Sequence, residues 1–155
     1  MIIANPETKE ANMILHKDIQ VGKTYSQEEI EESFNTKFGY RLAGINIRNP
    51  EDDPKYIILT SKESGPYNDE LSGDTEEFFY IGEGLPDKGD QEKTNANKTL
   101  INSIDNYLPI FLFVSQNPGE WEYQGLVDVL NYQYVNNGER NIFRFKMRKL
   151  GISKP

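Results

Sequence analysis

The sequence predicts one α+β domain, built on a curved β-sheet that forms a partly closed barrel with two or more flanking helices. The chain has 155 residues, of which 36% are hydrophobic and 12% aromatic, enough to bury one core. Roughly six short segments have the apolar or alternating pattern of strands, and two have the pattern of helices. No internal repeat or linker divides the chain, so we expect an N-terminal arm over residues 1–20 and a single domain over residues 21–155.

The first expected helix lies in "TYSQEEIEESF", and its start is marked by a capping signal. Ser26 is followed three residues later by Glu29, which is the spacing of a capping box. Acidic residues in the first turn suit the positive end of the helix dipole. Ile30 and Phe34 would then lie on one apolar face of this helix.

The remaining elements follow from hydrophobic patterns. Strands are expected in "YRLAGINI" (40–47), "YIILT" (56–60), "FFYIG" (78–82), "PIFLFVS" (109–115), "YQGLVDVLNYQYV" (123–135) and "IFRFKMRKL" (142–150), and a second helix in "TNANKTLINSIDN" (94–106). In the last strand, apolar residues from Phe143 to Met147 alternate with basic residues from Arg144 to Arg148. One face of that strand is therefore expected in the core, and the other is expected to be basic.

Charge and composition exclude several classes of function. The net charge of −8 argues against indiscriminate nucleic-acid binding. The charge is uneven, however: residues 1–87 carry a net −10 and residues 88–155 a net +2, so a polyanion site is expected in the second half or in loops near it. Zero cysteines and the single His16 argue against a zinc site, and no cofactor is expected. No apolar run approaches the roughly 20 residues of a membrane helix. With no signal peptide visible either, a cytoplasmic location without a membrane partner is expected.

Several blocks occur in an order that is typical of one known family. They are "LAGI" (42–45), "YIILTS…GPYNDE" (56–70), "FYIGEG" (79–84), "DQEKTNANKTL" (90–100), "LPIFLFV" (108–114), "YQGLVDVLNY" (123–132) and "IFRFKMRKL" (142–150). Together they resemble the SRA domain (SET- and RING-associated, also called YDG), in the prokaryotic form because the loop "GEGLPDKGDQ" is compact. The resemblance implies a PUA-like fold and a domain that binds DNA carrying a modified cytosine and flips that base out of the duplex. In bacteria and archaea such domains target modification-dependent restriction enzymes.

The sequence departs from the family pattern at a few positions. Gln124 stands where the name motif Tyr-Asp-Gly has Asp, and Val127 stands where a Tyr follows. Ile81 replaces the Thr after the strand tyrosine. These departures leave the expected fold intact and bear on which base the domain prefers.

The resemblance also implies a pocket for the flipped base. The family pattern places Tyr67, Asp69 (with Glu70 as the alternative acid) and Tyr80 around it, with the main chain of Ile81 as a further polar contact. Two tyrosine rings would replace the lost stacking, each worth about 1–3 kcal/mol. A carboxylate would accept a hydrogen bond from the N4 amino group of cytosine.

Other residues are expected to contact the DNA around the pocket. Gly82 and Gly84 would adopt positive φ and bring the main chain close to sugar or phosphate. Lys88 would reach a phosphate, and Arg48 and Asn49 fall in a loop that the resemblance places at the groove. The basic face of the last strand would add backbone contacts. Asp90 and Gln91 are expected instead to brace the loop or cap the helix, and Asn97 is expected to be structural.

Two alternative functions are left open by the residues. One keeps the fold but reads RNA or another modified base. The other is a metal-dependent hydrolase that uses Asp53 with Lys55, or Glu83 with Asp87. A standard catalytic constellation is not visible in the sequence, so we expect a non-catalytic binding module whose nuclease, if any, is another domain or subunit.

Overall fold

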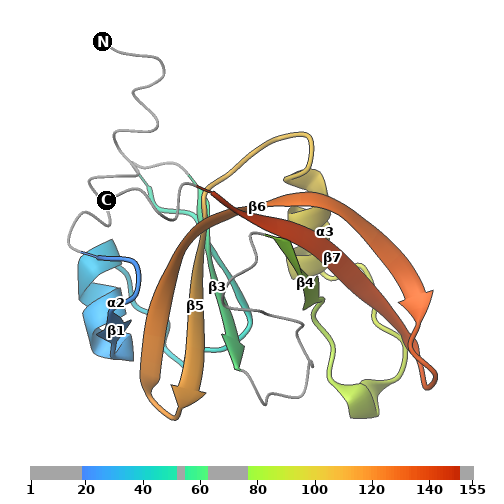
Figure 1. Ribbon diagram of the computed structural model, residues 1–155, viewed down its shortest axis with the longest axis horizontal. Coiled ribbons are helices and arrows are strands. Elements are labelled where there is room, and N and C mark those ends of the chain that lie inside the picture. Colours follow the sequence, from blue (N-terminus) through green and yellow to red (C-terminus); the bar gives the residue numbers. More distant parts are fainter. Residues whose placement is uncertain (1–18, 52–54, 63–76, 151–155) are drawn as a thin grey trace.

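The structure is a computed structural model that describes residues 19–51, 55–62 and 77–150 (Figure 1). Its elements are β1 (Thr24–Tyr25), α2 (Gln27–Phe34), β2 (Ile45–Arg48), β3 (Tyr56–Lys62), β4 (Glu77–Ile81), the 3₁₀ turn η1 (Pro86–Lys88), α3 (Asn95–Asn102), β5 (Ile110–Asn117), β6 (Glu120–Asn136) and β7 (Asn141–Leu150). The predicted α+β class is confirmed.

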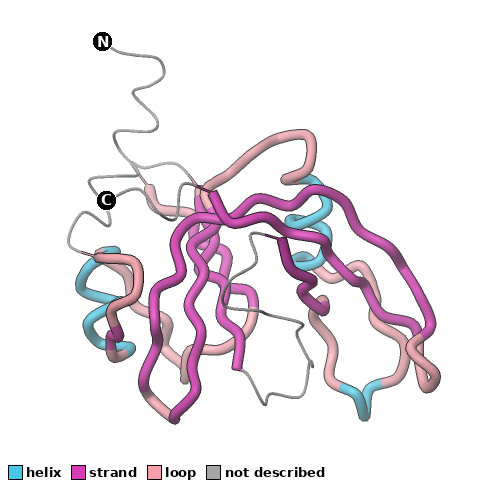
Figure 2. The backbone as a smooth tube through the Cα atoms, viewed as in Figure 1, coloured by secondary structure: helices cyan, strands magenta, loops and turns pink. Residues whose placement is uncertain are grey.

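All seven strands belong to one sheet. Its order is β2-β3-β5-β6-β7-β4, and β1 pairs with β6. Every pair is antiparallel except β3 with β5, which are parallel. β6 and β7 run together as a long arch across the molecule (Figure 2). In the part of the chain that the structure describes, the end strands β2 and β4 do not pair with each other, so closure into a barrel stays a prediction.

The curved sheet separates two hydrophobic cores, one for each helix (Figure 1). The α3 core contains Ile57, Leu59, Phe78, Tyr80, Leu100, Ile110, Leu112, Val114, Val127, Val129, Phe143, Phe145 and Met147. The α2 core contains Ile30, Phe34, Phe38, Leu42, Tyr56, Ile58, Phe111, Phe113, Trp121 and Tyr123. Residues of β3 and β5 alternate between the two cores, as the period of a strand that is buried on both faces requires.

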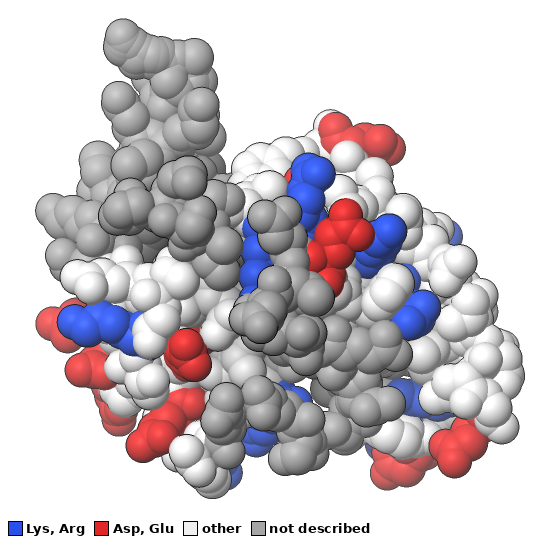
Figure 3. All heavy atoms as spheres, in the orientation of Figure 1, with Lys and Arg blue, Asp and Glu red and all other residues white. Residues whose placement is uncertain are grey.

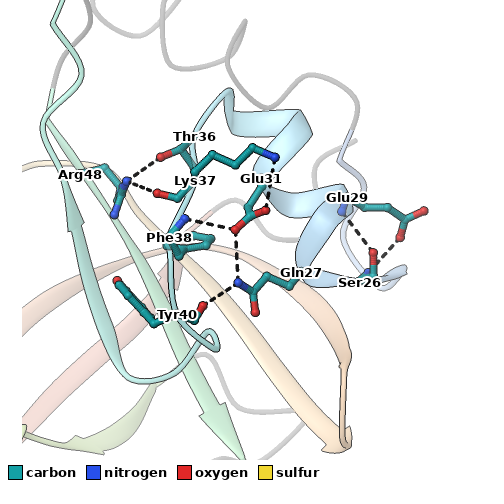
Figure 4. Close-up of polar contacts among 9 residues, drawn as sticks. All are labelled: Ser26, Gln27, Glu29, Glu31, Thr36, Lys37, Phe38, Tyr40 and Arg48. Atoms are coloured by element: carbon teal, nitrogen blue, oxygen red, sulfur yellow. Dashed lines mark hydrogen bonds and ion pairs between the residues drawn. The ribbon is translucent and has the colours of Figure 1, made fainter.

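Helix α2 begins at the predicted capping box (Figure 4). The Ser26 hydroxyl accepts a hydrogen bond from Glu29 N at 3.1 Å, and Ser26 N donates to Glu29 Oε1 at 2.9 Å. The helix ends at Asn35, which adopts the left-handed conformation with φ 53°. As predicted, Ile30 and Phe34 form its buried face.

The loop between α2 and β2, hereafter the α2–β2 loop, is fastened to the helix by polar side chains (Figure 4). Gln27 Nε2 donates to Tyr40 O at 2.8 Å, and Gln27 Oε1 accepts from Leu42 N at 2.8 Å. Glu31 Oε2 accepts from Phe38 N at 3.1 Å. This backbone hydrogen bond is the main reason why the pKa of Glu31 lies below its ordinary value of 4.5.

Asn46 on β2 holds the far end of the same loop. Its Nδ2 donates to Gly44 O at 3.2 Å and to Ile58 O at 3.0 Å, and its Oδ1 accepts from the Tyr40 hydroxyl at 2.8 Å. The loop is therefore fixed to both α2 and the sheet.

Strand β6 contributes to both cores and contains a bulge. Gly125 and Tyr123 lie opposite consecutive residues of β5, so Gln124 is an extra residue. Gly125 has φ 99°, a conformation that glycine adopts most easily. The bulge reverses which side chains face which core: Trp121 and Tyr123 lie in the α2 core, whereas Val127 lies in the α3 core.

The structure corrects the sequence-based elements in four places. The helix expected over 94–106 ends at Asn102. The two-residue strand β1 was not predicted. The strand expected over 40–47 begins only at Ile45, because the preceding residues form the fastened α2–β2 loop. The strand expected over 123–135 spans Glu120–Asn136, too long to be one of six short strands.

In the described ranges, no helix is both long and apolar enough to cross a membrane.

Candidate nucleic-acid interface

The main chain leaves β4 through Gly82, Glu83 and Gly84, hereafter the GEG turn. Gly82 N donates to Phe143 O at 2.8 Å, which extends the pairing of β4 with β7 by one residue. From Gly84 the chain continues through the exposed 3₁₀ turn η1 to Gln91.

Gln91 holds the GEG turn from one side. Its Nε2 donates to Gly82 O at 2.8 Å and to Gly84 O at 3.1 Å. Its Oε1 accepts from Phe143 N at 2.8 Å, and its main-chain oxygen accepts from the Tyr134 hydroxyl at 2.8 Å. The residue is only 2% exposed, and its hydrogen bonds with Gly82 O and Phe143 N are buried.

Asn97, in the first turn of α3, holds the GEG turn from the other side. Its Oδ1 accepts from Glu83 N at 2.8 Å, and its Nδ2 donates to Glu83 O at 3.1 Å and to Glu92 O at 2.8 Å. Asn97 is 0% exposed. Its position is set by Thr94, whose side chain caps α3 by accepting from Asn97 N at 3.2 Å.

The glycines of the turn are required by this packing. A Cβ at Gly82 would lie 2.7 Å from Asn97 Oδ1, and one at Gly84 would lie 2.9 Å from Gln91 Cγ. Gly84 has φ +132°, as expected, but Gly82 is not among the residues with positive φ, so that expectation is wrong for Gly82. Gly82 has no room for a side chain because two buried carboxamides lie against the position that a Cβ would take.

The outer part of the loop is held by the start of β7. A terminal nitrogen of the buried Arg140 donates to Leu85 O at 2.6 Å and to Gly89 O at 3.0 Å. Asp90 Oδ1 accepts from Asn141 N at 2.7 Å. These contacts leave Lys88 exposed on the surface of the loop.

Tyr80 lies two residues before the turn with its ring in the α3 core. Its hydroxyl donates to Thr60 O at 2.6 Å, and the residue is 2% exposed. Ile81, next to it, is also buried. The structure thus brings Tyr80, Ile81, Gly82 and Gly84 together, with Lys88 on the same loop.

Three predicted pocket residues lie outside the described residues: Tyr67, Asp69 and Glu70. The described chain stops at Lys62, at the end of β3, and resumes at Glu77, at the start of β4.

Arg48 ends β2, and Asn49 follows it. This end of β2 lies beside the start of β3, away from Thr60 and Tyr80. Arg48 is opposite Tyr56, at the start of β3, whereas Thr60 lies four residues further along, roughly 13 Å away at the rise of a strand. The Arg48 guanidinium donates to Thr36 Oγ1 at 2.7 Å and to Lys37 O at 2.8 Å (Figure 4). Arg48 and Asn49 are therefore not brought next to Tyr80.

The predicted basic face of β7 is confirmed, and its cations have partners. The Arg144 guanidinium lies 3.6 Å from the centre of the Phe79 ring. Lys146 pairs with Glu77 at 3.4 Å and Arg148 with Asp128 at 3.3 Å. Figure 3 shows Lys and Arg side chains over the region of β6 and β7, with Asp and Glu side chains beside them. Exposed ion pairs of this kind contribute little to stability, so their cations can exchange partners at small cost.

Sequence reasoning found most of this bracing but missed one part of it. Asp90 and Gln91 were expected to brace the loop, and both do. Arg140 was not identified, because a single arginine before a strand has no pattern that distinguishes a buried brace from a surface charge. Among the described residues, no three His, Asp or Glu side chains come together as metal ligands would.

Comparison with solved structures finds the same fold in SRA domains. The SUVH5 SRA domain in a complex with methylated CHH DNA has a TM-score of 0.67 and 23% identity, over 85% of this chain and 89% of that one. The SUVH5 SRA domain bound to fully hydroxymethylated CG DNA also has a TM-score of 0.67 and 23% identity, over 87% and 91% of the two chains. KRYPTONITE, in a complex with mCHH DNA, an H3(1–15) peptide and SAH, has a TM-score of 0.66 and 17% identity, and the similarity covers 94% of this chain and 36% of KRYPTONITE.

A search of curated proteins found no match. A scan against family models matched the model described as "ScoMcrA-like, SRA domain" over residues 21–150. This match covers most of the sequence and spans β1 to β7, including the GEG turn and both helices. The chain therefore belongs to the family of ScoMcrA-like SRA domains.

Proposed function

We propose that this chain binds double-stranded DNA that carries a modified cytosine, and that it holds that base flipped out of the duplex. The observation that carries the proposal is its membership of the SRA family over residues 21–150. The SUVH5 domains that share its fold were solved with methylated and with hydroxymethylated DNA, which supports this ligand class.

The proposed pocket lies beside the GEG turn. Tyr80 supplies one aromatic face, and Tyr67 supplies the other. Asp69, or Glu70 in its place, accepts from the cytosine amino group, and the main chain of Ile81 adds a polar contact. The Tyr80 hydroxyl is bound to Thr60, so the ring has a fixed orientation before a base arrives. Because Tyr80 is 2% exposed, one face of its ring must become accessible when the base enters.

Contacts to the DNA backbone would come from residues around this pocket. Lys88 is exposed on the loop that follows the turn, which suits a contact with a phosphate. Gly82 and Gly84 allow the main chain of the turn to approach the sugar. Arg48 and Asn49 lie at the end of β2 that is away from Tyr80, and they would contact a more distant part of the duplex.

The biological setting that we propose is a modification-dependent restriction system in the cytoplasm. In it this domain recognises the target and does not itself cleave DNA, and the cut is made by a nuclease domain or subunit. Incubation with modified plasmid DNA and Mg²⁺ or Mn²⁺ tests this part, and cleavage by the isolated chain would overturn it.

The central experiment is a titration with short duplexes that differ at one cytosine: unmodified, 5-methyl or 5-hydroxymethyl, at one fixed salt concentration. We expect the wild type to prefer one modified duplex by at least about tenfold. Tyr80→Leu should lose this preference because it removes the stacking face. Tyr80→Phe should keep part of it, because it retains the ring and loses only the hydroxyl bond to Thr60. Equal binding to all three duplexes by the wild type would overturn the proposal, and a matched RNA would then test the alternative that the domain reads RNA.

Base flipping is tested separately from binding. A 2-aminopurine placed beside the modified cytosine should become more fluorescent when the base is removed from the stack. Tight binding with no such increase would mean that the chain reads the modified base inside the duplex.

A further inference from the structure

Two buried carboxamides bind most of the polar main-chain groups of the GEG turn. Gln91 Nε2 donates to the carbonyl oxygens of Gly82 and Gly84. Asn97 binds both the N–H and the carbonyl of Glu83. Since Gly82 and Gly84 have no side chains of their own, these contacts fix where the turn lies.

The same carboxamides connect the turn to the neighbouring strand and helix. Gln91 Oε1 accepts from Phe143 N, while Phe143 O accepts from Gly82 N, so both main-chain groups of Phe143 take part. Asn97 belongs to α3, and its neighbour Leu100 lies in the same core as Tyr80. A shift of the turn would therefore be transmitted to β7 and to the end of β4.

This arrangement bears directly on the orientation of Tyr80. Only Ile81 separates Tyr80 from Gly82. On one side the Tyr80 hydroxyl is held by Thr60 O at 2.6 Å, and on the other the chain is held at Gly82 by Phe143 and Gln91. Tyr80 is thus held at its hydroxyl and, two residues further along the chain, at Gly82. A side chain that is held in this way loses little conformational freedom when a ligand binds, which is the physical basis of preorganisation.

We propose that Gln91 and Asn97 are positioning residues of the base pocket, which set its selectivity by fixing the GEG turn and thereby Tyr80. This inference rests on the proposed function. It goes beyond a structural role, because it requires that the preference between modified and unmodified DNA changes when either carboxamide is lost. A residue that only stabilises the fold would change the melting temperature and leave that preference intact.

The test compares Asn97→Ala with a matched variant, Asn46→Ala. Asn46 is buried to a similar extent, 3% exposed against 0% for Asn97, and it also makes three hydrogen bonds. It is not a member of the proposed pocket, and it fastens the α2–β2 loop. Binding is measured well below both melting temperatures, with modified and unmodified duplexes.

We expect both variants to melt earlier than the wild type, and only one to lose selectivity. The ratio of the Kd for unmodified DNA to the Kd for modified DNA should fall by at least about tenfold in Asn97→Ala. It should stay within about twofold of the wild-type ratio in Asn46→Ala. An unchanged ratio in Asn97→Ala would overturn the inference, and so would an equal fall of the ratio in both variants.

Gly82→Ala provides a second test that keeps both carboxamides, for use if Asn97→Ala does not fold. The added Cβ would lie 2.7 Å from Asn97 Oδ1 and would push this side chain away, so Gly82→Ala should also lower the ratio of the two Kd values. In the double variant Gly82→Ala/Asn97→Ala, the ratio should fall no further than in Asn97→Ala alone. Losses that simply add would show that the two residues act separately and would overturn the inference.

Failure of the proposed function is recognised from the wild type alone. If the wild type shows no preference for any modified duplex, the proposed function fails, and the inference fails with it. If the wild type discriminates and Asn97→Ala discriminates equally, only the inference fails. Amide hydrogen exchange at Glu83 and Phe143 shows independently of DNA whether a variant has released the turn, because these N–H groups bind Asn97 and Gln91.

Discussion

The α2–β2 loop and the GEG turn are fastened by the same kind of side chain, and they differ in how much space surrounds them. In each, one Gln and one Asn bind main-chain groups: Gln27 and Asn46 in the loop, Gln91 and Asn97 in the turn. A Cβ at a loop glycine such as Gly39 would contact nothing within 4 Å, whereas one at Gly82 would come within 2.7 Å of a neighbour.

The difference shows that a buried carboxamide can serve two purposes. In the α2–β2 loop it holds a segment whose glycines, Gly39 and Gly44, have open space around them, so small shifts at these glycines are tolerated. In the GEG turn it is packed directly on the main chain, so a shift of the turn requires a shift of the carboxamide as well. The network of the loop also includes the carboxylate of Glu31, which makes it sensitive to pH.

The largest effect that separates the two regions is expected from Gln91→Ala. The substitution leaves the carbonyls of Gly82 and Gly84 and the Phe143 N–H without their buried partner, so the free energy of unfolding should fall by about 3 kcal/mol. Gln27→Ala, in the less enclosed loop, should cost about 1 kcal/mol. Urea denaturation measures both. Equal losses would show that the two regions do not differ in the way described.

A somewhat smaller loss is expected from Gly82→Ala. The added methyl group meets Asn97 Oδ1 at 2.7 Å and Phe143 Cβ at 3.0 Å, so it overpacks the turn and should cost about 2 kcal/mol. The midpoint of thermal unfolding reports this change. A variant as stable as the wild type would mean that the carboxamides adjust freely, contrary to the tight packing described.

On the other side of the comparison, Ser26→Ala should reduce stability by about 1 kcal/mol, because it removes the hydroxyl that caps α2. The preference for modified DNA should not change, since the helix is separated from the proposed pocket by the sheet. A loss of that preference in Ser26→Ala would show that the two sides of the molecule are coupled.

The smallest effect depends on pH and belongs to the α2–β2 loop alone. Hydrogen bonding from Phe38 N keeps the pKa of Glu31 below its ordinary value of 4.5. The folded state therefore binds this proton less readily than the unfolded state, and the stabilisation is present above pH 4.5 and is lost as the pH falls further. Glu31→Gln should lower stability at neutral pH, and its difference from the wild type should shrink in acid. A difference that does not vary with pH would contradict this assignment.

Local patterns in the sequence predicted the parts of the fold that depend on neighbouring residues. Three of these parts depend on fixed spacings in the sequence, and each is confirmed. They are the capping box at Ser26, the alternation along β7 and the buried face of α2. β1 could not be found this way because a two-residue strand has no periodicity, and it exists through its pairing with β6. The reversal of faces within β6 was also hidden, since a bulge depends on the register of the partner strand.

For the candidate site, the sequence placed Tyr80 and the GEG turn correctly next to each other, but it did not reveal that Gly82 has no room for a side chain. Glycine was expected there for a positive φ, which Gly82 does not have. The packing partner, Asn97, is 15 residues away in the sequence and becomes a neighbour only when α3 folds onto the sheet. Contacts between distant segments leave no local pattern, which is why Arg140 was missed as well.

The strands that the two cores share determine how the whole domain should unfold. Strands β3 and β5 supply residues to both cores, and the bulge at Gln124 makes β6 a member of both as well, because Trp121 and Tyr123 face one core and Val127 faces the other. Neither core can lose β6 without opening the other, so the two sides should melt in one cooperative, two-state transition. Changes made at α2 and at the GEG turn are then expected to move the same melting curve, although they act on opposite faces of the sheet.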